Sequence, residues 1–188
     1  MIKKVIWCPA FILVFILISS SSAYAEKATL ENIITSNDEK FLMVSFRLTD
    51  CFTEAMKEAI DNGIDTAFTY IVRLYEVRHL WWDRKVKDLK IKRLIKYDSL
   101  KKVYQIKLPT ENDKTIFVKN FVAAKRILSE VIGLRVIEIG KLYKGRHYKI
   151  QLMAKLDKTS LPFRLHNILF FLPLWDFETD WYTLDIVK

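Results

Sequence analysis

The sequence is poor in the residues that cross-link a chain. Only two of its 188 residues are cysteines. Cys8 lies in an N-terminal segment that we expect to be removed, so the mature chain keeps Cys51 alone and has no partner for an internal disulfide. The fold must therefore be stabilised by packing. Cys51 follows Asp50 near a predicted helix start, which could activate a thiol, but its neighbour Phe52 favours a buried, inert one.

Residues and motifs that carry chemistry are also scarce. The three histidines, His79, His147 and His166, are far apart and lack the close spacing of a metal-binding pair. No nucleophile-elbow Gly-x-Ser-x-Gly or cysteine-centred signature is present. The acidic residues near the C-terminus alternate with aromatic ones and lack the central glycine of a calcium loop. The sequence therefore predicts no cofactor, no metal and no catalytic residue.

A long apolar run is present only at the N-terminus. Lys3 and Lys4 precede an apolar stretch from Val5 to Ile18, and Ala23-Tyr24-Ala25 follows a serine run. This order is typical of a signal peptide, and the apolar stretch is shorter than the roughly 20 residues that span a bilayer. We expect residues 1–25 to be removed after Ala25 and residues 26–188 to form one globular domain in the periplasm. An uncleaved helix anchored in the inner membrane is the alternative.

The chain is basic. It has 31 Lys and Arg against 22 Asp and Glu, and without Lys3 and Lys4 the balance is 29 against 22, a net charge of +7. Such a charge often indicates nucleic-acid binding, but export separates the chain from DNA and ribosomes. Acidic envelope polymers, lipid headgroups and acidic proteins are therefore better candidate partners than nucleic acid.

Period-two alternation dominates the mature chain and predicts an α+β fold. It is clearest in Phe41–Leu48 and Leu89–Tyr97. We expect a mostly antiparallel β-sheet or sandwich, because the strands follow one another without regular βαβ alternation. The predicted strands are 41–48, 64–77, 89–97, 103–108, 115–119, 134–139, 148–156 and 181–187.

Two short segments have helical spacing. The first follows a cap at Asp50 or Thr53 and is stopped by Gly63. The second is capped by Asn120 and is expected to end before Gly133, with Val131 on its apolar stripe. The predicted fold therefore has two short helices.

Three surfaces are candidate binding sites. Adjacent indoles cannot both enter one core from a regular strand, so Trp81-Trp82 with Asp83 and Arg84 indicates either a contact site for a sugar or protein or a corner that seals the sheet edge. Lys90, Lys92 and Lys96 share one face of the predicted strand, and this face suggests an anionic ligand or a solvated surface. Lys85, Lys87 and Arg93 add to the same charge.

The third surface is the most apolar stretch of the mature chain, Leu161–Trp175, which contains Phe170 and Phe171. It is too short to span a bilayer. Buried, it would be a core segment, and exposed, it would contact a membrane surface or a partner protein.

Several landmarks resemble an exported proteobacterial family known as domain of unknown function 4390. They are Ala59-x-x-x-Gly63, Trp81-Trp82-Asp83-x-x-Val86, Tyr97-Asp98-x-Leu100-x-x-x-Tyr104, the stretch Leu156-Asp157 to Leu161-Pro162, and Trp175 with Trp181. The resemblance covers the chain from about Leu30 to its C-terminus. It implies export, but it brings no activity, substrate or catalytic residue.

We therefore expect an exported envelope protein that acts as a non-enzymatic binding or accessory module. Its partner would be an envelope protein or an anionic envelope component, with peripheral membrane contact as a further mode. Two alternatives remain at this stage: a periplasmic enzyme whose site is assembled from scattered residues, and a membrane-tethered subunit of a signalling or assembly complex. The sequence does not predict an oligomeric state.

Overall fold

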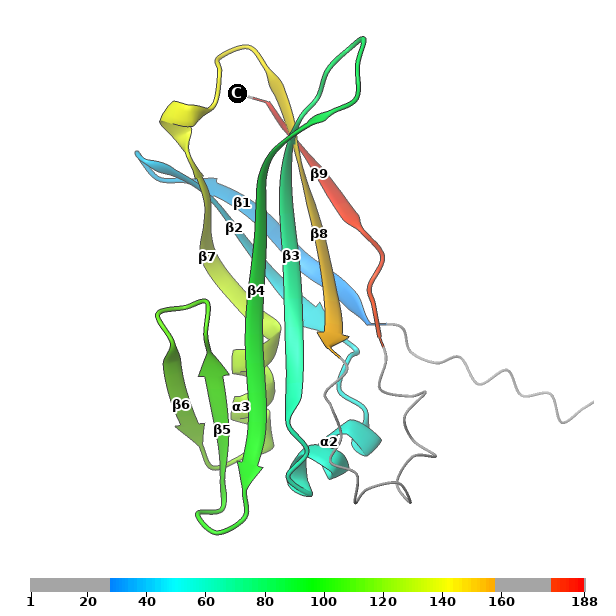
Figure 1. Ribbon diagram of the computed structural model, residues 1–188, viewed down its shortest axis with the longest axis vertical. Helices are drawn as coiled ribbons and strands as arrows, with labels where there is room; N and C mark the ends of the chain where they lie inside the picture. The colour runs from blue at the N-terminus through cyan, green and yellow to red at the C-terminus, as the bar shows by residue number, and fades with distance from the viewer. Residues whose placement is uncertain (1–27, 158–176, 188) are drawn as a thin grey trace, which may run out of the picture.

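The computed structural model describes residues 28–157 and 177–187, which form two antiparallel sheets and two helices (Figure 1). In chain order the elements are β1 (Thr29–Asn37), β2 (Phe41–Thr49), α2 (Glu54–Asp61), β3 (Thr66–Glu76), β4 (Arg84–Asp98), β5 (Val103–Leu108), β6 (Lys114–Val118), α3 (Phe121–Ser129), β7 (Glu130–Glu138), the 3-10 turn η1 (Ile139–Lys141), β8 (His147–Asp157) and β9 (Tyr182–Val187). The predicted antiparallel α+β class is confirmed.

The two sheets enclose one core. The smaller sheet has the order β1-β2-β7, and the larger has the order β6-β5-β4-β3-β8-β9. Period two in β2 places Leu42, Val44, Phe46 and Leu48 on the buried face, as the sequence predicts. Phe46 packs against Tyr70 of β3 with ring centroids 5.4 Å apart, so the smaller sheet lies against the centre of the larger one.

The helices begin where the sequence predicts. The Thr53 hydroxyl accepts a hydrogen bond from the Met56 amide at 3.2 Å, and the Asn120 side chain accepts one from the Ala123 amide at 2.8 Å. Gly63 has φ +83° just after α2, which favours glycine over any other residue at this stop.

The predicted end of the second helix is wrong. α3 ends at Ser129, and Val131, which the sequence analysis placed on the helix stripe, lies in β7 opposite Phe46 of β2. The carbonyls at the end of α3 find donors on the larger sheet: Tyr70 donates to the Leu128 carbonyl, and Arg93 donates to those of Ile127 and Glu130. Because these side chains satisfy the helix end, the chain turns directly into a strand.

β1 is a strand that the sequence analysis missed. Its register against β2 shifts between Glu31 and Ile34, and Asn32 within this bulge has φ +50°. The bulge destroys period two, so the exposed and half-buried positions of β1 do not alternate regularly.

Candidate functional site

The predicted Trp81-Trp82 corner lies in the connection between β3 and β4, Val77–Asp83, which we call the tryptophan loop. Figure 1 shows this connection projecting at one end of the molecule. Trp81 and Trp82 are 77% and 93% exposed, and Leu80 beside them is 87% exposed. Both indoles therefore face solvent and do not themselves cover the sheet edge, whereas Asp83 caps the turn by accepting a hydrogen bond from the Arg78 amide.

The base of the tryptophan loop is fixed by hydrogen bonds and ion pairs. The Val77 amide donates to the His147 carbonyl at 2.9 Å, and the Arg78 amide donates to the Asp83 carboxylate at 3.4 Å. The Lys149 ammonium donates to the same carboxylate and, with the Arg78 amide, lowers the pKa of Asp83. Arg84 binds the buried Glu76 at 2.6 Å, so Asp83 and Arg84 of the predicted corner are held by contacts to β3 and β8, whereas the two indoles extend beyond them.

The predicted basic face on β4 exists, but intramolecular partners occupy most of it. Lys92 pairs with Asp157 at 3.1 Å, and Lys96 pairs with Asp65 at 3.4 Å, whereas Lys90 is exposed and forms no ion pair with any described residue. Burial alone would raise the pKa of Asp157, but hydrogen bonds from Lys92 and Thr69 lower it overall. The two pairs are partly exposed, so each contributes little to stability.

Arg93 does not belong to this basic face. It lies on the same buried face of β4 as Ile91 and Ile95, and it is only 5% exposed. Its guanidinium binds the Glu111 carboxylate at 2.8 Å through both Nε and NH2, and it donates through NH1 to the carbonyls of Ile127 and Glu130 at 2.5 Å each. Arg93 was predicted to be a solvated cation because its partners Glu111, Ile127 and Glu130 lie 18 to 37 residues further along the chain.

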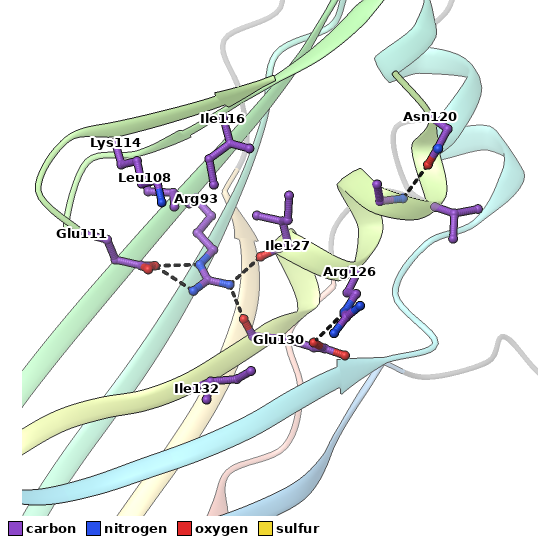
Figure 2. A pocket seen from close by; sticks show the side chains of 12 residues that line it. Arg93, Leu108, Glu111, Lys114, Ile116, Asn120, Arg126, Ile127, Glu130 and Ile132 are labelled. Carbon is purple, nitrogen blue, oxygen red and sulfur yellow. Dashed lines mark hydrogen bonds and ion pairs between the residues drawn. The ribbon is translucent and has the colours of Figure 1, made fainter. Parts of the chain in front are cut away.

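A groove that the sequence analysis missed lies beside Arg93 (Figure 2). It has a volume of about 860 Å³ and is bounded by the β5–β6 hairpin, α3 and the start of β7. Its apolar lining comes from four consecutive elements: Leu108 of β5, Ile116 of β6, Val122 and Ile127 of α3, and Ile132 of β7. Val122 and Ile132 are 79% and 78% exposed, and exposed apolar side chains beside a groove are typical of a contact surface.

The groove is bordered by a strand edge. Among the described residues β7 is the last strand of its sheet. It pairs with β2 along one edge, and no described strand pairs with its other edge. The Glu130 carbonyl at the start of β7 accepts a hydrogen bond from Arg93, so the first residue of this edge faces the groove and is already bonded there. An edge strand with exposed backbone groups can accept an added strand from another polypeptide.

Cations outnumber carboxylates in the groove. Its two carboxylates already have partners, since Glu111 binds Arg93, and Glu130 binds Arg47 at 2.8 Å and Arg126 at 3.2 Å. Lys114 forms no ion pair with any described residue. The groove therefore combines an apolar lining with an available positive charge.

The remaining candidates from the sequence fall into three groups. Cys51 is buried, and burial raises the pKa of its thiol to about 12, which matches the inert alternative. His79 and His147 are exposed, and in the described part of the chain no three His, Cys, Asp or Glu side chains gather as a metal site. Phe170, Phe171, His166 and the predicted signal peptide lie outside the described residues.

The protein is therefore an antiparallel α+β protein in which the edge of β7 lies beside the apolar groove. A family model described as Domain of unknown function (DUF4390) matches residues 25–185, so the chain belongs to this family, as its landmarks indicate. No curated protein and no solved structure is significantly similar to the chain. No helix among the described residues has the length and hydropathy to cross a membrane.

Proposed function

We propose that the protein is an exported, non-enzymatic accessory module of the cell envelope that binds an extended segment of a partner protein in the groove beside β7. The observation that carries this proposal is the free edge of β7 next to an apolar lining. The partner segment would add a strand to the smaller sheet and place alternate side chains in the groove.

The size of the two sheets supports this mode of binding. In the described part of the chain the smaller sheet has three strands and the larger has six, so the smaller sheet cannot cover the larger one strand for strand. The half-buried Ile116 of β6 lines the groove together with the exposed Ile132 of β7, whereas Leu108 of β5 is already buried at its base. A fourth strand beside β7 would cover this apolar surface and satisfy backbone groups at the edge.

The charge of the groove defines the partner further. Lys114 is available for a carboxylate, and the carboxylates of Glu111 and Glu130 are already bound by arginines. A segment with apolar residues on one face and at least one acidic residue near Lys114 would complement the groove. The partner is therefore an extended, partly acidic polypeptide.

In-cell crosslinking of variants tests this function. Val122 and Ile132 are exposed, so the double substitution Val122→Asp with Ile132→Asp should leave the fold intact while it places two charges against the partner's apolar side chains. We expect the dominant crosslinked protein seen with the wild type to fall at least tenfold. Lys114→Glu should weaken the same crosslink by repelling the acidic residue.

Leu100→Asp is the matched control. Leu100 is 94% exposed in the β4–β5 turn and does not line the groove, so this variant should crosslink like the wild type. Equal loss in the control, or an unchanged crosslink in the groove variant, would exclude the groove as the binding site.

Export has its own test. We expect the intact mass of the protein recovered from the cell envelope to begin at Glu26, because Ala23-Tyr24-Ala25 has the small residues of a cleavage site. A mass that retains residues 1–25 would favour the membrane-tethered alternative.

A further inference from the structure

The tryptophan loop carries an apolar tip that nothing in the proposed groove function uses. Leu80, Trp81 and Trp82 are consecutive and all more than three-quarters exposed. Three consecutive large apolar side chains in solvent lower solubility and favour aggregation unless they have a binding role.

The base of the tryptophan loop is held by the rest of the fold. The hydrogen bond from Val77 to His147 and the Lys149–Asp83 ion pair close the loop at both of its ends. Arg84 and Arg146 both approach the buried Glu76 just below the loop, at 2.6 and 3.8 Å. The loop is therefore presented on a supported base, and its apolar tip lies beyond these contacts.

Exposed cations lie at the same end of the molecule as the tip. The connection from β7 to β8 reaches the same end of the molecule as the tryptophan loop (Figure 1). The carboxylates near the base, Glu76 and Asp83, are bound by cations, whereas Arg78 and Lys144 have no carboxylate partner among the described residues. The other exposed cations at this end form ion pairs: Arg84 and Arg146 with Glu76, Lys85 with Asp88, and Lys141 with Glu138.

We propose that the tryptophan loop inserts into the interface of a phospholipid bilayer that contains anionic headgroups. Indole rings favour this interface because the ring is apolar and its N–H can bind a headgroup oxygen. Leu80 would enter the acyl boundary, while Arg78 and Lys144 would contact lipid phosphates. An apolar tip with unpaired cations at the same end of the molecule matches an anionic membrane surface better than it matches a neutral one.

The geometry leaves the groove open in this orientation. In Figure 1 the tryptophan loop lies at one end of the long β3–β4 hairpin, and the β5–β6 hairpin lies toward the other. A molecule docked by its tip would therefore hold the groove away from the lipid surface. The membrane proposal stands on the loop alone and does not depend on partner binding in the groove.

Vesicle binding tests the proposal. The full-length protein as recovered from cells is mixed with vesicles of phosphatidylglycerol and phosphatidylcholine, or of phosphatidylcholine alone, and bound protein is sedimented. Trp81→Ser with Trp82→Ser should lower the partition coefficient on the mixed vesicles by roughly a hundredfold. Arg78→Gln with Lys144→Gln should lower it by roughly fivefold per charge at low salt, and little on phosphatidylcholine.

Leu100→Ser with Phe117→Ser is the matched control. These side chains are 94% and 57% exposed outside the loop, so this variant should bind like the wild type. Lipids brominated on their acyl chains quench only tryptophans that reach the bilayer, so quenching reports on the position of the indoles. The N-terminal apolar segment is common to all variants, so a difference in quenching between the wild type and the tryptophan variant comes from the loop. The emission of Trp81 and Trp82 should be quenched in the wild type.

Two outcomes would overturn the proposal. In the first, the wild type and the Trp81→Ser, Trp82→Ser variant bind the mixed vesicles equally, and the quenched fraction of emission is the same. In the second, the wild type does not bind these vesicles at all, and the tip is then a contact for another protein.

Discussion

At the scale of single residues, Arg93 accounts for the junction between the larger sheet and α3. Its guanidinium connects β4 to the hairpin through Glu111 and to the end of α3 through two carbonyls. A cation at a helix C-terminus is also favoured by the helix dipole. The buried charge is tolerated because Glu111 balances it and the two carbonyls accept its hydrogen bonds.

Replacing Arg93 should therefore destabilise the fold. In Arg93→Met the two carbonyls lose their donor and Glu111 loses its cation, so we expect the free energy of unfolding to fall by about 3 kcal/mol. Urea denaturation followed by circular dichroism measures this loss. Arg93→Lys should recover less than half of it, because one ammonium cannot serve all three partners. A loss below about 1 kcal/mol for Arg93→Met would contradict this structural role.

Cys51 supplies a prediction about reactivity. Burial raises the pKa of its thiol to about 12, so almost no thiolate is present in the folded protein at pH 8. Iodoacetamide at this pH should leave the peptide that contains Cys51 unmodified in the folded protein and should modify it in urea. The readout is mass spectrometry of that peptide. Comparable rates in the two conditions would show that the thiol is accessible.

At the scale of elements, β7 begins four residues before its predicted start. Its register against β2 shifts between Val44 and Phe46, and Gly133 at this bulge has φ +62°. The Gly133 amide donates to the Ser45 hydroxyl at 2.9 Å, which compensates for the interrupted ladder. Glycine at this position thus serves a strand bulge and not a helix stop.

Alanine at position 133 tests this interpretation. A Cβ there would meet no atom within 4 Å, so the cost of Gly133→Ala comes from the left-handed backbone conformation alone. We expect a loss of about 1 kcal/mol in the free energy of unfolding, measured in urea. Gly140→Ala is the control, because Gly140 has equal space and no positive φ, and it should change stability by less than about 0.5 kcal/mol.

Most elements could be predicted from the sequence because period-two alternation and helix caps involve residues that are close together in the chain. β5 matches its predicted bounds, β2 and β8 extend theirs by one residue or two, and Thr53 and Asn120 cap the helices as expected. The predicted boundaries were wrong where side chains far away in the sequence determine the end of an element. The end of α3 depends on Tyr70 and Arg93, which are far from it in sequence, and β1 is hidden by its bulge.

At the scale of the whole molecule, the two candidate surfaces differ in how far sequence could predict them. Adjacent indoles identified the tryptophan loop because one short segment contains the entire tip. The groove could not be found in the same way, because hairpin, helix and strand residues line it together. The identity of the free edge beside it depends on the strand order of the smaller sheet.

Site-specific photo-crosslinking in cells tests the central claim most directly. A photoreactive amino acid at position 132 would lie in the groove, and one at position 100 would lie in an exposed turn outside it. The account predicts one dominant crosslinked protein from position 132, attached through an extended segment, and none from position 100. The same products from both positions, or no protein product from position 132, would contradict it.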